Sequence, residues 1–211
     1  MIDLALELRE ALARPLPGRS YQESMLPAAR VGQVSPADPR PSAVLVPIVA
    51  DLGSHAILLI ERAAGGPHGG QIAFPGGSEE EGDASAAETA LREAREEIGL
   101  DRGEVEVLGP LSPLTIEVSG FLVQPVVGFA RGVRGLSPSP GEVAAIHRVP
   151  LARLLDPSSK TEREIEARGE RLLAPCYVFS EVLVWGATAM ILAELEEVLR
   201  RAAQFRPGFH P

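Results

Sequence analysis

The chain has 211 residues, of which 45% are hydrophobic and 23% charged, as expected for one folded domain rather than a disordered segment. Its net charge of −9 argues against nonspecific nucleic-acid binding, which needs a basic surface, and gives no long-range attraction for a phosphorylated ligand. The single cysteine, Cys176, cannot form an internal disulfide, and we expect it to be a small buried hydrophobe. No apolar run reaches membrane-spanning length and the start of the chain is acidic, so we expect no membrane partner and a cytoplasmic location.

The first forty residues combine a helical pattern with a proline-rich stretch. Apolar residues recur at helical spacing over residues 2–14, and Pro15 and Pro17 end the pattern. We expect an N-terminal helix with a covering segment, then the principal domain, then a tail, at residues 1–41, 42–205 and 206–211. Three arginines of the covering segment either touch a ligand or are solvated, as loop arginines usually are: Arg19, Arg30 and Arg40.

Alternating apolar residues between turn signals predict a series of strands. Residues 42–50 and 55–61 form a predicted hairpin around the turn Asp51-Leu52-Gly53-Ser54. Further strands are predicted at residues 71–74, 104–109, 121–130, 143–149, 161–166, 171–179 and 182–185, with 161–166 and 171–179 forming a second hairpin. Pro125 indicates a sheet edge or a bulge. A long amphipathic helix at 186–204 completes an α/β sandwich.

The run from Gly76 to Leu100 carries the strongest signal. It reads as a glycine turn, an acidic loop and a helix that begins at a capping box of Ser85 and Glu88 and stops at Gly99. One side of this helix is a narrow apolar stripe, formed by Ala87, Leu91, Ala94 and Ile98.

Three glutamates, Glu93, Glu96 and Glu97, occupy the other side of the same helix at the spacings that make helical neighbours. Like charges at these spacings cost a few tenths of a kcal/mol per pair unless a positive charge lies between them. A hard divalent cation, Mg²⁺ or Mn²⁺, suits such carboxylates, whereas the alternative is an ordinary solvated face. Arg92 either orients Glu96, four residues on, or forms a common helical ion pair with it.

The stretch Arg92-Glu93-Ala94-Arg95-Glu96-Glu97-Ile98-Gly99-Leu100 resembles the second half of the Nudix box, and Pro75-Gly76-Gly77 resembles the turn that opens it. One departure is an extra residue between Asp83 and Arg92, which leaves the role of Asp83 open. With this one-residue insertion, the box resembles that of the coenzyme A pyrophosphatase branch of the family.

The likeness to that branch extends from about residue 42 to residue 200. Its segments are Leu58-Leu59-Ile60-Glu61-Arg62-Ala63, Gly70-Gln71-Ile72-Ala73-Phe74-Pro75-Gly76-Gly77, Ser119-Gly120-Phe121-Leu122-Val123-Gln124-Pro125-Val126 and Val184-Trp185-Gly186-Ala187-Thr188-Ala189. Two positions differ from the signature of the branch, because Ile60 replaces a threonine and Gly66 stands where its second arginine belongs.

This resemblance implies a Nudix-type α/β/α sandwich with a mixed sheet, a catalytic loop and helix, and a long C-terminal helix. It also implies hydrolysis of a phosphoanhydride bond with Mg²⁺ or Mn²⁺, for which Glu93 and Glu97 would be direct ligands. Glu96 would bind through water or assist a second ion. A small nucleotide is the expected ligand, and a monomer and a homodimer both stay open.

Other residues receive weaker assignments. Arg62 grips a phosphate or lies on the surface, and His68 contacts the substrate or lies free in its glycine-flanked loop. Gly76 and Gly77 belong to the substrate side of the expected site. Glu142 is the candidate general base, with a solvated loop glutamate as the alternative. Two aromatic residues fit a core better than an adenine platform, namely Trp185 and Tyr177.

Three functions are compatible with these patterns. The first is coenzyme A hydrolysis to 3′,5′-ADP and 4′-phosphopantetheine. The second is hydrolysis of another nucleoside diphosphate derivative, such as ADP-ribose or NADH, which Gly66 favours. The third is a noncatalytic binding module of the same fold, which the intact glutamate triplet disfavours.

Overall fold

The computed structural model describes residues 3–32, 37–51, 54–65, 68–117, 119–167 and 169–204. Its α-helices are α1 (Leu4–Leu12), α2 (Arg19–Glu23), α3 (Ala86–Ile98), α4 (Leu151–Leu155) and α5 (Gly186–Gln204). Its 3₁₀ helices are η1 (Ala28–Arg30), η2 (Arg102–Glu104) and η3 (Pro157–Ser159). Its strands are β1 (Arg40–Asp51), β2 (Ser54–Arg62), β3 (Ile72–Ala73), β4 (Gly76–Ser78), β5 (Glu106–Pro110), β6 (Leu114–Ile116), β7 (Phe121–Ala130), β8 (Val143–Pro150), β9 (Lys160–Ala167), β10 (Glu170–Phe179) and β11 (Val182–Trp185).

The larger sheet is mixed, as predicted. β1 and β2 form the expected antiparallel hairpin, whose turn residues Leu52 and Gly53 lie outside the described residues, and β1 pairs in parallel with β7. Toward its C-terminal end β2 leaves β1, and the short strands β3 and β4 fill the gap by pairing with β2 and β1 respectively. The candidate site lies where β1 and β2 diverge.

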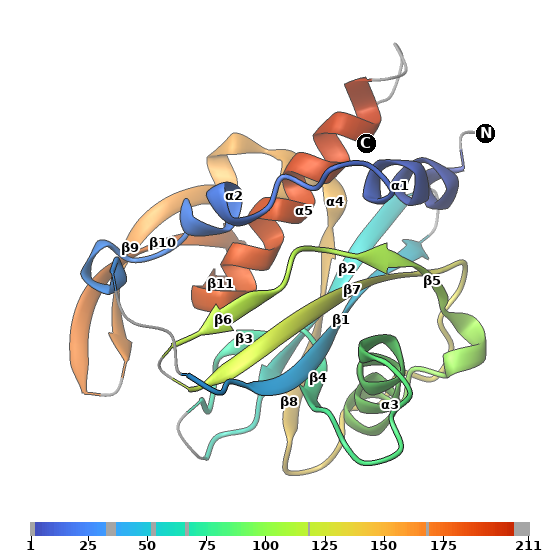
Figure 1. Ribbon diagram of the computed structural model, residues 1–211, viewed down its shortest axis with the longest axis horizontal. Helices are drawn as coiled ribbons and strands as arrows, with labels where there is room; N and C mark the ends of the chain where they lie inside the picture. Colours follow the sequence, from blue (N-terminus) through green and yellow to red (C-terminus); the bar gives the residue numbers. More distant parts are fainter. Residues whose placement is uncertain are drawn as a thin grey trace.

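Alternate side chains of β1 enter two separate cores. Leu45 and Val49 pack with the apolar stripe of α3, whereas Val46 and Ile48 pack with α1 and α5. Figure 1 shows this arrangement, with α3 on one side of the sheet and α1 and α5 on the other. The predicted α/β/α sandwich is therefore confirmed.

A smaller antiparallel sheet, β9–β10–β11, lies beside α5 (Figure 1). Its β9–β10 hairpin agrees with the sequence prediction, and Arg168 in its turn lies outside the described residues. Pro125 is in the interior strand β7, so the expected sheet edge is wrong. The Pro125 carbonyl accepts a hydrogen bond of 3.0 Å from Leu111 N. Leu111 lies between the end of β5 and the start of β6, so Pro125 falls between the residues of β7 that pair with β5 and those that pair with β6. The N–H that proline lacks is therefore not needed for the pairing of β7 with β5 or β6.

The N-terminal segment is tied to the body of the protein. Leu4, Leu8 and Met25 are buried in the core that α5 lines. The buried carboxylate of Glu194 on α5 accepts a hydrogen bond of 2.9 Å from the Gln22 side chain. It also accepts bonds from the backbone amides of Gly18, in the N-terminal segment, and Ser112, between β5 and β6. The division of the chain at residues 41 and 205 stays a prediction. No helix in the described part of the chain is both long and apolar enough to cross a bilayer.

Candidate active site

The two glycines before the acidic loop form a strand rather than the predicted turn. Gly76 and Gly77 pair with Val44 and Ala43 of β1. A Cβ atom on Gly76 would lie 2.6 Å from Val44 Cα, and one on Gly77 would lie 2.6 Å from the carboxyl carbon of Glu93. Real Cβ atoms essentially never approach closer than 3.0 Å, so only glycine allows the Glu93 carboxylate to lie against β4.

Helix α3 begins and ends where the sequence predicts. The Ser85 hydroxyl accepts a bond of 3.3 Å from Glu88 N, and Gly99 ends the helix in the left-handed conformation at φ 68°. The predicted apolar stripe packs on the sheet, although Ala87 is only partly buried and Ala90 is fully buried beside it. These contacts fix the direction in which the glutamates of α3 point.

Glu97 is buried beside the apolar stripe, with 6% of the residue exposed, so its predicted place on the opposite side of the helix is wrong, as is the alternative of a solvated face for this residue. Gly76 N donates a hydrogen bond of 3.0 Å to Glu97 Oε2. The pKa of Glu97 is raised from 4.5 to about 7, chiefly by burial. The Gly76 hydrogen bond and the charge of Arg62 lower it, and the charges of Glu93 and Glu142 raise it. The site therefore contains a carboxylate whose negative charge lacks full compensation.

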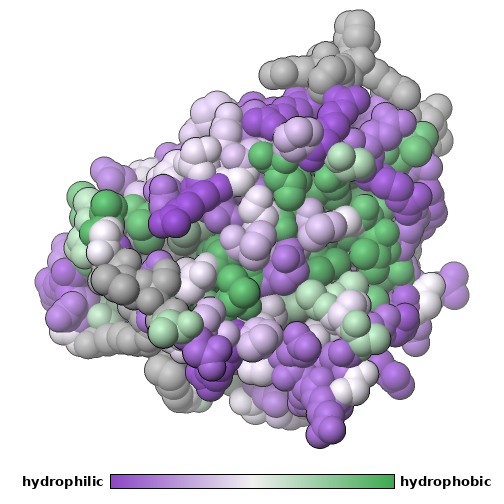
Figure 2. Space-filling view, in the orientation of Figure 1, coloured by the Kyte–Doolittle hydropathy of each residue, from purple (hydrophilic) through white to green (hydrophobic). Residues whose placement is uncertain are grey.

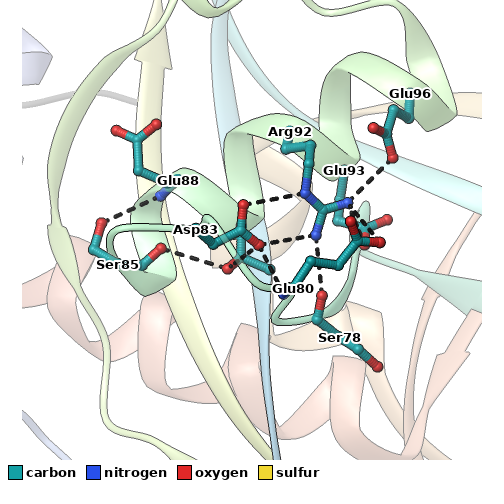
Figure 3. Close-up of polar contacts among 9 residues, drawn as sticks. Ser78, Glu80, Asp83, Ser85, Glu88, Arg92, Glu93 and Glu96 are labelled. Atoms are coloured by element: carbon teal, nitrogen blue, oxygen red, sulfur yellow. Dashed lines mark hydrogen bonds and ion pairs between the residues drawn. The ribbon is translucent and has the colours of Figure 1, made fainter.

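Arg92 lies between the other two glutamates (Figure 3). Its Nη1 donates to Glu93 Oε1 at 3.0 Å and to Glu96 Oε2 at 3.2 Å. The Glu93 side chain is 16% exposed and burial raises its pKa, whereas the Glu96 side chain is 57% exposed. Arg92 thus supplies the positive charge between Glu93 and Glu96. The two largely buried carboxylates that a bound cation would neutralise are Glu93 and Glu97.

Asp83 is the principal partner of Arg92. Arg92 donates to both Asp83 carboxylate oxygens, at 3.2 and 3.0 Å, and also to the Ser78 carbonyl at 3.0 Å. Thr89 Oγ1 donates to Asp83 at 2.9 Å. The guanidinium of Arg92 lowers the pKa of Asp83 from 3.8 to about 2. Despite the extra residue in the loop, Asp83 therefore contacts Arg92 and holds its guanidinium. The sequence alone left this role of Asp83 open.

Arg62 and Glu142 lie near Glu97 from two other segments. Arg62 is the last residue of β2, and Ala63 N donates 2.8 Å to the carbonyl of Glu142, which holds the loop before β8 at this strand end. The charge of Arg62 lowers the pKa of Glu97 and that of Glu142 raises it. The structure thus brings together Glu93, Glu97, Arg62 and Glu142, which lie far apart in the sequence.

A cavity of about 380 Å³ opens beside β4. Four of its lining residues are those predicted to face the substrate: Arg62, His68, Gly76 and Gly77. His68 Nδ1 lies 3.1 Å from Gln71 Oε1. The opposite wall is largely apolar and comes from β6, β7 and the start of α5, where Figure 2 shows hydrophobic surface bordered by hydrophilic residues.

The two aromatic residues expected in the core differ in their surroundings. Tyr177 is fully buried and its hydroxyl donates to Glu196 at 2.7 Å, as expected for a core residue. Trp185 is only partly buried and lines the cavity, so its assignment to the core is wrong. Trp185 ends β11 directly before α5 begins at Gly186, and both residues line the cavity.

Comparison with known proteins places these residues in a family. The family model described as NUDIX domain matches residues 39–168. The chain belongs to the Nudix family. It is 39% identical to a protein of Photorhabdus laumondii named "Uncharacterized Nudix hydrolase NudL", over 75% of this chain and 84% of that protein. A protein of the same name from Escherichia coli K12 is 39% identical over 74% of this chain and 81% of its own length.

A solved structure supports the fold. The chain resembles a Nudix hydrolase from M. Smegmatis, RenU, with a TM-score of 0.52 and 18% identity over 77% of this chain and 87% of that one. As a Nudix hydrolase, the protein is an enzyme that acts on phosphoanhydride bonds.

Nudix hydrolases use divalent metal cations. The described residues contain no cluster of three histidine, cysteine, aspartate or glutamate side chains already arranged around a metal. The donor chemistry nevertheless fits a Nudix cation, because Glu93 and Glu97 are two carboxylates on adjacent turns, both pressed against β4 and both with raised pKa values. Mg²⁺ takes oxygen ligands and often needs only one or two from the protein, with water supplying the rest.

Two residues of this Nudix site were not assigned from the sequence. The unusual box spacing leaves the role of Asp83 open in the sequence, and its pairing with Arg92 becomes visible only in the folded loop. Arg30 lines the cavity, although the sequence offers no signal that separates it from Arg19 or Arg40. Gly66, at the position of the missing arginine, lies outside the described residues.

Proposed function

We propose that this Nudix hydrolase cleaves the diphosphate linkage of coenzyme A to 3′,5′-ADP and 4′-phosphopantetheine. The observation that carries the proposal is the cavity beside β4, which is lined by Gly76 and Gly77 and by segments that resemble the coenzyme A branch. Those segments include Phe74 to Gly77 and Trp185 to Thr188, and members of both line this one cavity. Gly76 N donates a hydrogen bond to Glu97, and Gly77 lies against the Glu93 carboxylate. The wall formed by β4 therefore separates the cavity from neither carboxylate by more than one residue.

Each charged residue has a proposed task in this reaction. Glu93 and Glu97 would hold Mg²⁺ or Mn²⁺, with Glu96 acting through water. Neutralisation of the diphosphate charge is the chemistry that the cation supplies when bound. Arg62 binds a diphosphate oxygen, and the exposed Glu142 accepts the proton of the attacking water. Arg92, held by Asp83, orients Glu93 and Glu96.

A second candidate is hydrolysis of ADP-ribose or NADH. The replacement of the signature arginine by Gly66 favours it, since loss of one arginine–phosphate contact costs about 1.5–3 kcal/mol, or roughly ten- to a hundredfold in affinity. We therefore expect measurable but unexceptional turnover of coenzyme A. An arginine elsewhere in the cavity would compensate for the missing contact.

The test is a substrate panel with product identification. Purified protein with Mg²⁺ or Mn²⁺ is offered coenzyme A, an acyl ester of coenzyme A, ADP-ribose, NADH and a nucleoside triphosphate. Release of 3′,5′-ADP and 4′-phosphopantetheine, with a higher kcat/KM than for ADP-ribose or NADH, supports the proposal. Cleavage of ADP-ribose with coenzyme A left intact contradicts it.

A further inference from the structure

The cavity carries positive charge that the phosphoanhydride chemistry does not use. The protein has a net charge of −9, yet the described residues lining the cavity include two arginines, one histidine and no carboxylate. Arg62, at the end of β2, acts electrostatically on the nearby Glu97. Arg30, the other arginine, belongs to η1 in the N-terminal segment.

Arg30 is half-buried and has no ion-pair partner among the residues that the structure describes. Its guanidinium carbon lies 5.9 Å from the centre of the Trp185 ring, within the range of a cation–π contact. Arg40, by contrast, lies over Phe121 and donates to the Ser119 carbonyl, and it is not among the lining residues. Beyond Arg62, which is assigned to the diphosphate, the arginine available to a ligand in the cavity is therefore Arg30.

The segment that presents Arg30 is fixed in position. Arg30 N donates a bond of 2.8 Å to the Pro27 carbonyl, closing η1. Met25 is buried in the core, and Gln22 bonds to the buried Glu194 of α5. The start of α5 also lines the cavity, so one helix supports both the wall and the segment that carries Arg30. Figure 1 shows this part of the chain, in blue, crossing α5 toward β9 and β10.

We propose that Arg30 is a specificity-determining residue, whose guanidinium binds a phosphate monoester on the nucleotide half of the substrate while Trp185 holds it in place. This inference rests on the proposed function for the identity of that phosphate. Coenzyme A carries a ribose 3′-phosphate in addition to its diphosphate, whereas ADP-ribose and NADH do not. A phosphate monoester has about 1.5–2 negative charges near pH 7, and arginine binds it with two parallel hydrogen bonds. Arg30 thereby supplies from the N-terminal segment the contact that Gly66 cannot make.

Binding is measured without turnover through Trp185, which is the only tryptophan of the chain. Its fluorescence is followed as wild-type protein, Arg30→Gln and Arg30→Lys are titrated with adenosine 3′,5′-bisphosphate or with adenosine 5′-monophosphate. Arg19→Gln is the matched control, because Arg19 lies in the same segment, is 84% exposed and is not among the lining residues. We expect wild type and Arg19→Gln to prefer the bisphosphate by about ten- to a hundredfold, Arg30→Gln to lose the preference and Arg30→Lys to keep part of it.

Kinetics give the second readout. Arg30→Gln should raise KM for coenzyme A by the same factor, with kcat within about twofold, and leave KM for 3′-dephospho-coenzyme A almost unchanged. Equal losses on both substrates, or an unaltered preference for the bisphosphate in Arg30→Gln, would overturn the inference. If wild type cleaves ADP-ribose and not coenzyme A, the proposed function fails, and the fluorescence preference still decides the role of Arg30.

Discussion

Replacing Glu97 by glutamine removes a negative charge that folding buries beneath β4, and it keeps an oxygen that can accept the Gly76 hydrogen bond. The pKa of Glu97 rises from 4.5 in a solvated chain to about 7 in the folded protein. Between these values the unfolded chain has lost the proton and the folded protein still retains it. The raised pKa therefore costs no stability below about pH 4.5, costs progressively more as the pH rises, and reaches its full cost above about pH 7.

The size of the cost follows from the shift. At about 1.4 kcal/mol per pKa unit, the difference between 4.5 and about 7 corresponds to roughly 3 kcal/mol at pH 8 and roughly 1.5 kcal/mol at pH 5.5. In the absence of divalent ions, Glu97→Gln should raise the free energy of unfolding by these amounts. The same substitution should lower the hydrolysis rate at least about a hundredfold, because it removes a proposed ligand of the cation.

Urea denaturation in a chelating buffer at both pH values measures the gain. Glu96→Gln is the matched control on α3, since the Glu96 side chain is 57% exposed and its removal should change stability by less than about 1 kcal/mol. A gain from Glu97→Gln that is equal at both pH values, or absent at the higher one, would refute the account of a buried, uncompensated carboxylate. Mg²⁺ should raise the thermal unfolding midpoint of wild type but not that of Glu97→Gln.

Three further predictions concern the same site. Gly77→Ala should weaken Mn²⁺ binding by about tenfold or more, because its Cβ displaces the neighbouring carboxylate, whereas Gly132→Ala, with open space around it, should leave the calorimetric affinity unchanged. Asp83→Asn should lower kcat by about tenfold with a native circular-dichroism spectrum, since Arg92 loses its main partner; an unchanged kcat would remove Asp83 from the positioning network. Apparent Mg²⁺ affinity should fall about tenfold per pH unit as the pH drops below about 7, where a buried carboxylate takes up its proton, and a rate maximum below about pH 6 would contradict this.

Local signals explain what the sequence could predict. Ser85 and Gly99 mark the ends of α3 by capping chemistry that involves only their immediate neighbours, and the structure has both caps. The hairpins formed by β1 with β2 and by β9 with β10 follow from alternating side chains on either side of short turns. The glutamates of α3 were identified because helical periodicity sets which residues are neighbours.

The features that escaped prediction depend on contacts between distant segments. Gly76 and Gly77 become a strand only because β1 and β2 diverge and leave β1 without a partner there. Glu97 lies at the margin of the helical stripe, so its burial depends on how closely α3 approaches β4. Arg30 reaches the cavity because the N-terminal segment crosses α5, and no pattern near residue 30 reports that path.

We propose that this Nudix hydrolase cleaves the diphosphate of coenzyme A with the carboxylates that lie against β4. Mass spectrometry of the products formed from coenzyme A by wild type and by Glu97→Gln in the presence of Mg²⁺ tests this proposal. We expect equal amounts of 3′,5′-ADP and 4′-phosphopantetheine from wild type and almost none from the variant. Intact coenzyme A after incubation with wild type that cleaves ADP-ribose or NADH under the same conditions would contradict it.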